Sequence, residues 1–303
     1  MLTDRERLIL LNLIPDVGST PLRRLLDQFG DLDRVWQAGV RELRQVEGIG
    51  PLLAQRIAAG CRNERLVGEE VALAQRAGVR IVTLEDADYP TLLREIPDPP
   101  LVLYVRGTLP DPAAPAVAIV GSRHASRYGV EIAERLAYDL ALRGLTVISG
   151  LARGIDGAAH RGALKAQGRT LAVLGNGLSR IYPPEHEPLA KQIVEQGAVI
   201  SEYPMQMAPL AQNFPRRNRL ISGLSLGVVI VEAAQRSGAL ITADMALEQG
   251  REVFAVPGPI TRRTSQGTHH LLKQGARLVT SAEDILEELS LGVQPVAVTE
   301  SSS

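Results

Sequence analysis

From about residue 66 to residue 289, short apolar runs alternate with helical segments, and this alternation constrains the fold more than any other feature. Continuously apolar strands that alternate with helices predict a parallel sheet covered on both faces. We therefore expect an α/β fold with an extended Rossmann-like, mostly parallel sheet. The predicted strands are Arg80–Leu84, Leu101–Arg106, Val117–Gly121, Thr146–Ser149, Thr170–Leu174, Val199–Ser201, Val228–Val231, Val253–Val256 and Leu278–Thr280.

Before this region, residues 1–62 predict a small all-helical domain, because leucine recurs at helical spacing and β-branched runs are missing. Two segments within it are alike, Ile14–Gly18 and Val46–Gly50, and a helical segment follows each of them. This internal repeat is typical of a SAM-like helix-hairpin-helix domain. Its glycines allow a left-handed turn, and the N-terminus of the following helix offers free N–H groups to a phosphate.

A chain of 303 residues is long for one core, so we expect a helical domain over 1–62 and a Rossmann-like domain over 66–289. Residues 290–303 are typical of a flexible tail or the remnant of a linker, which favours a truncated form of a longer protein.

The net charge of −1 gives no global attraction to nucleic acid, so any DNA binding must come from a local basic patch. The single cysteine, Cys61, excludes a disulfide framework and a multi-cysteine metal site, which favours a reducing, cytoplasmic location. The apolar runs are too short for a membrane-spanning helix. We expect no membrane partner and no cofactor.

Glycine, serine and arginine recur where the predicted strands end. Ligands of open parallel sheets bind beyond the carboxyl ends of the strands, where glycines allow close approach and a helix N-terminus can hold a phosphate. Several such loops together predict a long, positively lined groove rather than a mononucleotide site. The candidate residues are Gly121, Ser122 and Arg123, then Gly150, Arg153 and Gly154, and finally Arg236, Ser237 and Gly238.

Asp156 and His160 follow the second of these loops and lie four residues apart, on one face of a predicted helix. A metal site or an acid/base pair is one interpretation. A third metal ligand is not evident, so we favour a hydrogen-bonded helical pair and predict neither a metal site nor a catalytic residue.

The segment Leu174–Pro184 begins like a dinucleotide-binding fingerprint, but Arg180 occupies the third glycine position. An acidic ribose ligand does not follow a strand about 20 residues on, as that motif requires. Nicotinamide binding is therefore disfavoured, and Asn176 is assigned to the predicted groove instead.

Three arginines fall within four residues, and a phenylalanine stands two positions before the first of them. A ring beside arginines suits single-stranded DNA, because the ring stacks on a base while the cations bind phosphates. The alternative is a hydrophobic staple with solvated arginines, but cations at a helix N-terminus oppose its dipole unless an anion is bound. The candidates in this cluster are Phe214, Arg216, Arg217, Asn218 and Arg219.

Together these segments resemble the DprA/Smf family of DNA-processing proteins, over about residues 66–288 and with a helical front domain that also fits. The resemblance implies a homodimer that binds single-stranded DNA, protects incoming strands in natural transformation, helps to load the RecA recombinase, and also acts in DNA repair. It implies no enzymatic activity. The stretches that carry it are Ala118–Arg123, Ser149–His160, Leu178–Glu185, Phe214–Ser225, Glu232–Thr242 and Gly250–Gly258.

By position, the resemblance makes Phe214 the stacking ring of the DNA groove and places the dimer surface at roughly residues 238–275. Two departures from the family stand out. Many members carry a lysine just before the Phe-Pro pair, where residues 209–213 have none. Many members also end in a winged-helix domain, which does not follow Leu289 here.

Two other functions are considered. A Rossmann-like nucleotide phosphohydrolase would use a carboxylate such as Glu232, but the Pro-Gly-Gly-x-Gly-Thr loop of such enzymes is missing at that junction. A protein-interaction scaffold whose sheet loops bind nothing is disfavoured, because the arginines beside Phe214 would repel one another without an anion.

Overall fold

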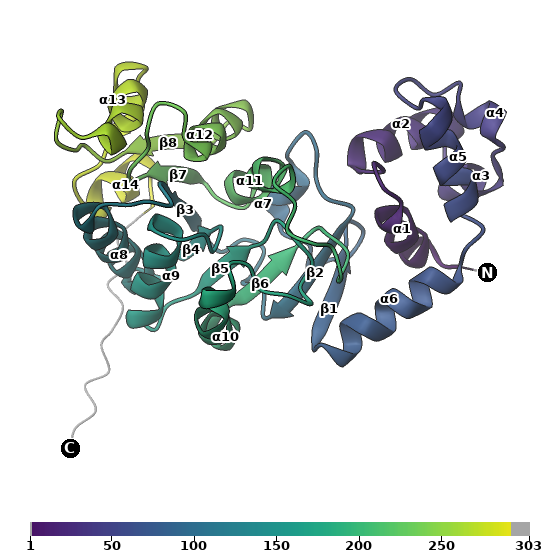
Figure 1. The fold of residues 1–303 in the computed structure, drawn as a ribbon, viewed down its shortest axis with the longest axis horizontal. Coiled ribbons are helices and arrows are strands. Elements are labelled where there is room, and N and C mark those ends of the chain that lie inside the picture. The colour runs from purple at the N-terminus through teal and green to yellow at the C-terminus, as the bar shows by residue number, and fades with distance from the viewer. Residues whose placement is uncertain (1, 292–303) are drawn as a thin grey trace.

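The structure is a computed structural model that describes residues 2–291, and it confirms the predicted α/β class (Figure 1). Every predicted strand is present, with ends that differ by at most two residues. The strands are β1 (Val79–Thr83), β2 (Val102–Gly107), β3 (Ala116–Val120), β4 (Thr146–Ser149), β5 (Thr170–Val173), β6 (Ala198–Ser201), β7 (Gly227–Ile230), β8 (Glu252–Ala255) and β9 (Arg277–Leu278).

Within the described residues these strands form a single sheet in the order β1-β2-β6-β5-β4-β3-β7-β8-β9. The β1–β2 and β2–β6 pairs are antiparallel, and all the other pairs are parallel. The parallel part places the carboxyl ends of β3, β4, β5, β7 and β8 at one edge, which is where the candidate loops begin.

Helices cover both faces of this sheet. Val117 and Phe254 mark a core shared with α8, α9 and α14, whereas Leu220 and Leu271 belong to the core on the opposite face, under α7, α11, α12 and α13. The helices after β1 are α7 (Thr91–Arg94), α8 (Arg127–Leu142), α9 (Ile155–Lys165), α10 (Glu187–Gln196), α11 (Asn213–Gly223), α12 (Gly238–Glu248), α13 (Gln266–Lys273) and α14 (Ala282–Glu288).

The front of the chain is helical, as predicted, and α2 and α5 follow the two repeated hairpins. In the second hairpin the left-handed residue is Gly48, at φ 78°. In the first hairpin it is Asp16, at φ 68°, whereas Gly18 is extended and caps α2. The helices are α1 (Asp4–Leu13), α2 (Ser19–Phe29), α3 (Leu32–Gln37), α4 (Val40–Leu43), α5 (Pro51–Gly60) and α6 (Arg65–Arg76).

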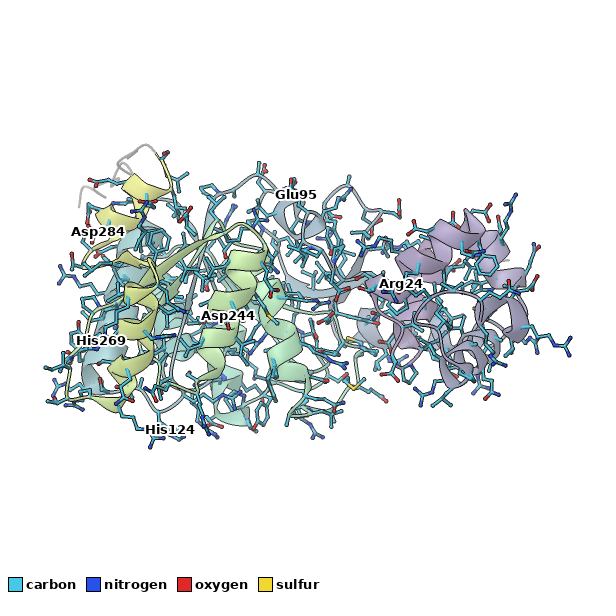
Figure 2. The ribbon with its side chains drawn as sticks, turned by 90° about the horizontal axis from the view of Figure 1, so that it is seen from above. Arg24, Glu95, His124, Asp244, His269 and Asp284 are labelled. Atoms are coloured by element: carbon cyan, nitrogen blue, oxygen red, sulfur yellow. The ribbon has the colours of Figure 1, made fainter. Side chains whose placement is uncertain are left out.

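The helical and sheet regions share one apolar core, in which Leu8 and Leu11 belong to the same cluster as Val102 and Leu174. Figure 2 shows the helical region, marked by Arg24, at one end of the molecule. The predicted domain limits stay a prediction, and the tail from residue 292 onward lies outside the described residues. None of the helices within residues 2–291 is long and apolar enough to cross a bilayer.

Candidate nucleic-acid interface

A groove of about 590 Å³ lies along the carboxyl edge of the sheet. The loops that follow β3, β4 and β5 form one wall, and the first turns of α11 and α12 form the other. This is the position that the sequence pattern predicts, because the carboxyl ends of parallel strands meet at one edge. Eight predicted residues line it, namely Gly121, Ser122, Arg123, Phe214, Arg217, Asn218, Ser237 and Gly238.

Phe214 stands at the start of α11, half-buried, with a cation and a second ring beside it. The Arg123 guanidinium carbon lies 5.2 Å from the centroid of the Phe214 ring, within the range of a cation–π contact. The ring of Tyr182 is 5.5 Å away, tilted by 40°. Tyr182 lies in a stretch that the sequence analysis quoted, but nothing in the local sequence placed it beside Phe214.

Two glycines of the groove, Gly121 and Gly238, differ in the space around them. A Cβ at Gly121 would lie 2.7 Å from Ile155 and 2.9 Å from the Glu232 carbonyl oxygen, so packing alone demands glycine there. A Cβ at Gly238 would meet nothing within 4 Å. Gly238 opens α12, and Ser237 caps that helix by accepting a hydrogen bond from the Ala239 N–H at 3.3 Å. The N-terminus of α12 is therefore open towards the groove.

Arg217 forms the floor of the groove rather than a free phosphate ligand. Only 4% of it is exposed, and its guanidinium donates to the carbonyl oxygens of Gly150, at 2.9 Å, and of Val173. Burial lowers the pKa of Arg217 to about 10, against the opposing attraction of Asp156. Burial likewise raises the pKa of Asp156, and the charge of Arg217 opposes that shift. The two hydrogen bonds of Arg217 fasten α11 to the loop after β4 and to the end of β5.

The prediction that Arg219 lines the groove is not supported by its position. Its guanidinium binds the carboxylates of Glu202, at 2.6 Å, and Asp98, at 3.1 Å, on the side of α11 that faces the helical region. Carboxylates of the same chain therefore neutralise Arg219, which reduces the repulsion expected among the three arginines. Arg216 is left exposed, without an ion pair among the described residues.

The loop after β4 contributes less than its sequence suggests. Gly150 and Arg153 line a small hollow that also touches Arg123 and Phe214, and Arg153 pairs with Glu185. Gly154, at φ 74°, does not line it, since a Cβ there would lie 2.3 Å from the Ser122 carbonyl oxygen. Gly154 holds the loops after β3 and β4 together.

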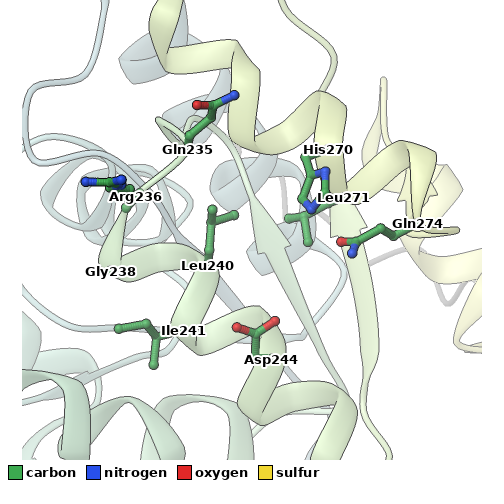
Figure 3. Close-up of a pocket in the computed structure, with 10 residues that line it drawn as sticks. Gln235, Arg236, Gly238, Leu240, Ile241, Asp244, His270, Leu271 and Gln274 are labelled. Carbon is green, nitrogen blue, oxygen red and sulfur yellow. The ribbon is translucent and has the colours of Figure 1, made fainter.

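Two further predicted residues lie outside the groove. Asn176 is fully buried, and its side-chain amide donates to the carbonyl oxygens of Gly177, at 3.0 Å, and Arg180, at 2.7 Å, which fixes the turn of the 174–184 loop. Arg236 is exposed at the mouth of a neighbouring hollow of about 460 Å³, between α12 and α13 (Figure 3).

The predicted hydrogen bond between Asp156 and His160 is not present. Asp156 accepts from the Ala152 N–H at 3.3 Å, whereas the His160 Nδ1 lies 2.7 Å from the Thr170 hydroxyl, which donates to the Val147 carbonyl oxygen. The two side chains form hydrogen bonds with different segments, because β5 packs against α9 beside His160. Among the described residues, no three His, Cys, Asp or Glu side chains are grouped to hold a metal ion.

Glu232, the carboxylate that a hydrolase would use, is 4% exposed and already engaged. It accepts from the Ser126 hydroxyl at 2.5 Å and from the Ser126 N–H at 2.8 Å. Ser126 in turn caps α8. Glu232 therefore fixes the β3–α8 loop that carries Ser122 and Arg123.

Comparison with protein families identifies the chain. A family model described as DNA recombination-mediator protein A matches residues 80–290, and a helix-hairpin-helix model matches residues 8–66. The chain belongs to the DNA recombination-mediator protein A family. The resemblance read from the loop residues is thereby confirmed.

Individual relatives agree with this family. Protein Smf of Escherichia coli is 53% identical over 70% of this chain and 57% of its own length, so the match spans little more than half of that protein. DNA processing protein DprA of Bacillus subtilis is 42% identical over 72% of this chain and 74% of its own length.

Two solved structures share the fold. DprA of Streptococcus pneumoniae superposes with a TM-score of 0.81 and 34% identity, covering 95% of this chain and 99% of that chain. DprA of Helicobacter pylori, whose structure addresses its single-stranded DNA binding mode, has a TM-score of 0.61 and 30% identity, covering 70% of this chain and 96% of that chain.

Proposed function

We propose that this chain binds single-stranded DNA in the groove at the carboxyl edge of its sheet and acts there as a recombination mediator. The observation that carries the proposal is the Arg123–Phe214 contact, with Tyr182 beside it, on the wall of an open groove. An aromatic ring with a cation and a second ring beside it is an arrangement that can hold an unpaired base. The named DNA-binding mode of the Helicobacter pylori relative supports this assignment.

In this proposal the phosphates bind to Ser122, to Arg123 and to the open N-terminus of α12, while one base stacks at Phe214. Arg216 and Arg236 contribute charge from the rims. The domain over 66–289 is the DNA-binding unit, and residues 1–62 are a SAM-like module packed against it. Residues 209–213 carry no lysine before Phe214, so the proposal leaves two alternatives: one phosphate contact fewer than in many family members, or a contact supplied by another part of the groove.

The finer activities belong to the same proposal. The chain protects incoming single strands and helps RecA to assemble on them, in natural transformation and in DNA repair, and it does so in the cytoplasm. It acts by binding and not as an enzyme. The engagement of Glu232 with Ser126 favours binding over nucleotide hydrolysis.

The proposed dimer surface is the outer side of α12 and α13 together with the loop between β8 and α13. Large apolar side chains are exposed on it, with Leu247 at 61% and Ile260 at 86%. Leu240 and Ile241 border the hollow beside His270 (Figure 3). Apolar exposure of this kind marks protein interfaces, and light scattering of the purified chain measures whether it forms a dimer.

The experiment that tests DNA binding follows the anisotropy of a labelled oligonucleotide, single-stranded and duplex, at two salt concentrations. We expect tighter, salt-sensitive binding to the single strand. Phe214→Ala should weaken it by about 1–3 kcal/mol, the value of one stacked base. Arg123→Ala should lower the slope of log K against log salt by about 0.7.

Arg169→Ala is the matched control, because Arg169 is exposed just before β5, at the opposite edge of the sheet. Its affinity should equal that of the parent chain. Parent-like binding by a double variant that lacks both Arg123 and Phe214 would contradict the proposed groove. RecA loading is measured by the DNA-dependent ATP hydrolysis of RecA on single strands coated with a single-strand-binding protein, with and without the chain.

A further inference from the structure

A further hollow, of about 410 Å³, lies on the far side of the loop that carries Tyr182. Tyr182 lines the DNA groove and, with Pro183, its adjoining small hollow, whereas Ile181 and Pro184 line this further hollow. The two hollows are therefore separated by one short stretch of chain. The hollow of about 410 Å³ is referred to below as the Arg106 pocket.

The Arg106 pocket contains two guanidinium groups, from Arg106 on β2 and Arg180 on the loop. Neither forms an ion pair with a carboxylate among residues 2–291. Arg106 donates from Nη2 to the Leu178 carbonyl oxygen at 2.9 Å, while its Nε is buried without a hydrogen-bond partner. Arg180 is exposed. A buried, unpartnered N–H on a cation is costly, and an anion in the pocket would satisfy it.

One carboxylate, that of Glu187, also lines the pocket. It is paired with Lys191, one turn along α10, at 3.4 Å. Two guanidinium groups therefore face a single carboxylate that a lysine already neutralises in part. The net charge available to a ligand is positive. Burial lowers the pKa of Arg106, and the charge of Glu187 opposes that shift.

The remaining walls are apolar. Leu178, Ile181 and Pro184 stand beside the two arginines, and the Asn176 side chain holds the loop in place through the Arg180 carbonyl oxygen, at 2.7 Å. A phosphate between the guanidinium groups would place its attached sugar or base against this apolar wall. The pocket thus suits a nucleotide phosphate better than a bare inorganic anion.

We propose that the Arg106 pocket is a second phosphate subsite, which takes the single strand onward after it leaves the groove at Tyr182. The proposal rests on the DNA-binding function proposed above and extends its footprint along the chain. Phosphate chemistry has two sources here, the continuing strand or a free nucleotide, and the experiment separates them.

The test measures affinity for oligothymidylates from about 4 to about 16 nucleotides, spanning known single-strand site sizes. The variants are Arg180→Ala and the control Arg169→Ala, which removes the same charge at the opposite edge of the sheet. Short oligonucleotides should bind both variants and the parent equally. Long ones should lose affinity only with Arg180→Ala, with a salt slope lower by about 0.7, as for one lost phosphate contact.

Arg106→Met serves as a second variant, and circular dichroism monitors whether it folds. Arg180→Ala changes an exposed side chain, so the test does not depend on Arg106→Met. A second arm titrates dTMP in the absence of DNA. Binding of dTMP that Arg180→Ala abolishes, without any length effect, would assign the pocket to a free nucleotide.

The outcomes separate the two proposals. If Arg180→Ala matches Arg169→Ala at every length and dTMP does not bind, the subsite is wrong while the groove stands. If the parent binds no oligonucleotide but binds dTMP through Arg180, the DNA-binding function fails while the phosphate pocket stands.

Discussion

The N-terminus of α2 and the carboxyl-edge groove are both suited to an anion, but only the groove is open. At α2, Ser19 and Thr20 donate to the Asp98 carboxylate, the latter at 3.1 Å, and Arg219 donates to it as well. Burial alone would raise the pKa of Asp98, but the Ser19 hydrogen bond and the charge of Arg219 outweigh it and hold the pKa below its usual value. The first hairpin is thus filled by a carboxylate of the same chain.

In the groove the buried carboxylate, Asp156, lines the floor beside Arg217, and the rim cations Arg216 and Arg236 form no ion pair within residues 2–291. The difference shows that a phosphate-binding motif in a sequence does not reveal whether the site is available. A carboxylate 78 residues away along the chain decides the outcome for Thr20. Three changes test this contrast.

The largest expected effect is the loss of Arg217, which supports the open site from below. Arg217→Met should lower the free energy of unfolding by about 3–5 kcal/mol, because it leaves the Asp156 charge buried without its cation. Urea unfolding measures this. Arg216→Met, one residue away and exposed, should change stability by less than about 0.5 kcal/mol. Equal effects of the two changes would mean that Arg217 does not support the floor.

The second change removes the carboxylate that occupies the N-terminus of α2. Asp98→Ala removes the acceptor of Ser19, Thr20 and Arg219, and should cost about 2 kcal/mol of unfolding free energy, since the carboxylate is half-exposed and partly screened. Asp88→Ala is the control, because the ion pair of Asp88 within the described residues is with exposed Arg80. Binding of single strands should not change. Duplex binding that appears only in Asp98→Ala would show that the carboxylate occupies a nucleic-acid site.

The third test uses acid to separate the two regions. Burial, assisted by the nearby charges of His186, Arg161 and Arg217, lowers the pKa of His160 from 6.5 to about 3. Between pH 6.5 and pH 3 the His160 imidazole is therefore protonated in the unfolded chain but not in the folded chain. The free energy of unfolding consequently falls as the pH falls from 6.5 towards 3. The pKa of the Asp98 carboxyl group is lowered from 3.8, so this group stays ionised and keeps its contacts over most of that pH range.

We expect His160→Gln to remove up to about 1.4 kcal/mol of pH dependence per pH unit below pH 6.5. Urea unfolding at pH 7 and pH 5 measures it, with His124→Gln, which changes an exposed histidine outside the proposed dimer surface, as the control. A parent chain and a His160→Gln variant with the same pH dependence would show that His160 is not the titrating group.

Much of the architecture could be read from the chain. The strands were located within one or two residues because each is a short apolar run bounded by turns, and parallel strands necessarily align their carboxyl ends. That alignment also placed Ser122, Arg123 and Gly238 correctly at one edge. The loop motifs were specific enough to indicate the family.

Which arginines face the groove could not be read in the same way. Arg216, Arg217 and Arg219 lie on one helix within four residues, yet one is exposed, one is buried under the loops and one bridges to Glu202 and Asp98. Their neighbours come from β4, β5, β6 and the segment before β2, so helical phase alone does not assign them. Tyr182 beside Phe214 and the absent Asp156–His160 bond have the same explanation.

The sequence by itself therefore determined the class of fold, the edge of the sheet that carries the site and the chemistry available there, since periodicity and residue type are local properties. The tertiary structure alone decided which of these groups are free. Whether a cation or a helix N-terminus is open depends on the nearest acceptor or donor in space, and chain folding brings that partner from far along the sequence. Asp98 closes the N-terminus of α2, and the carbonyl oxygens around Arg217 remove that cation from the free groups of the groove.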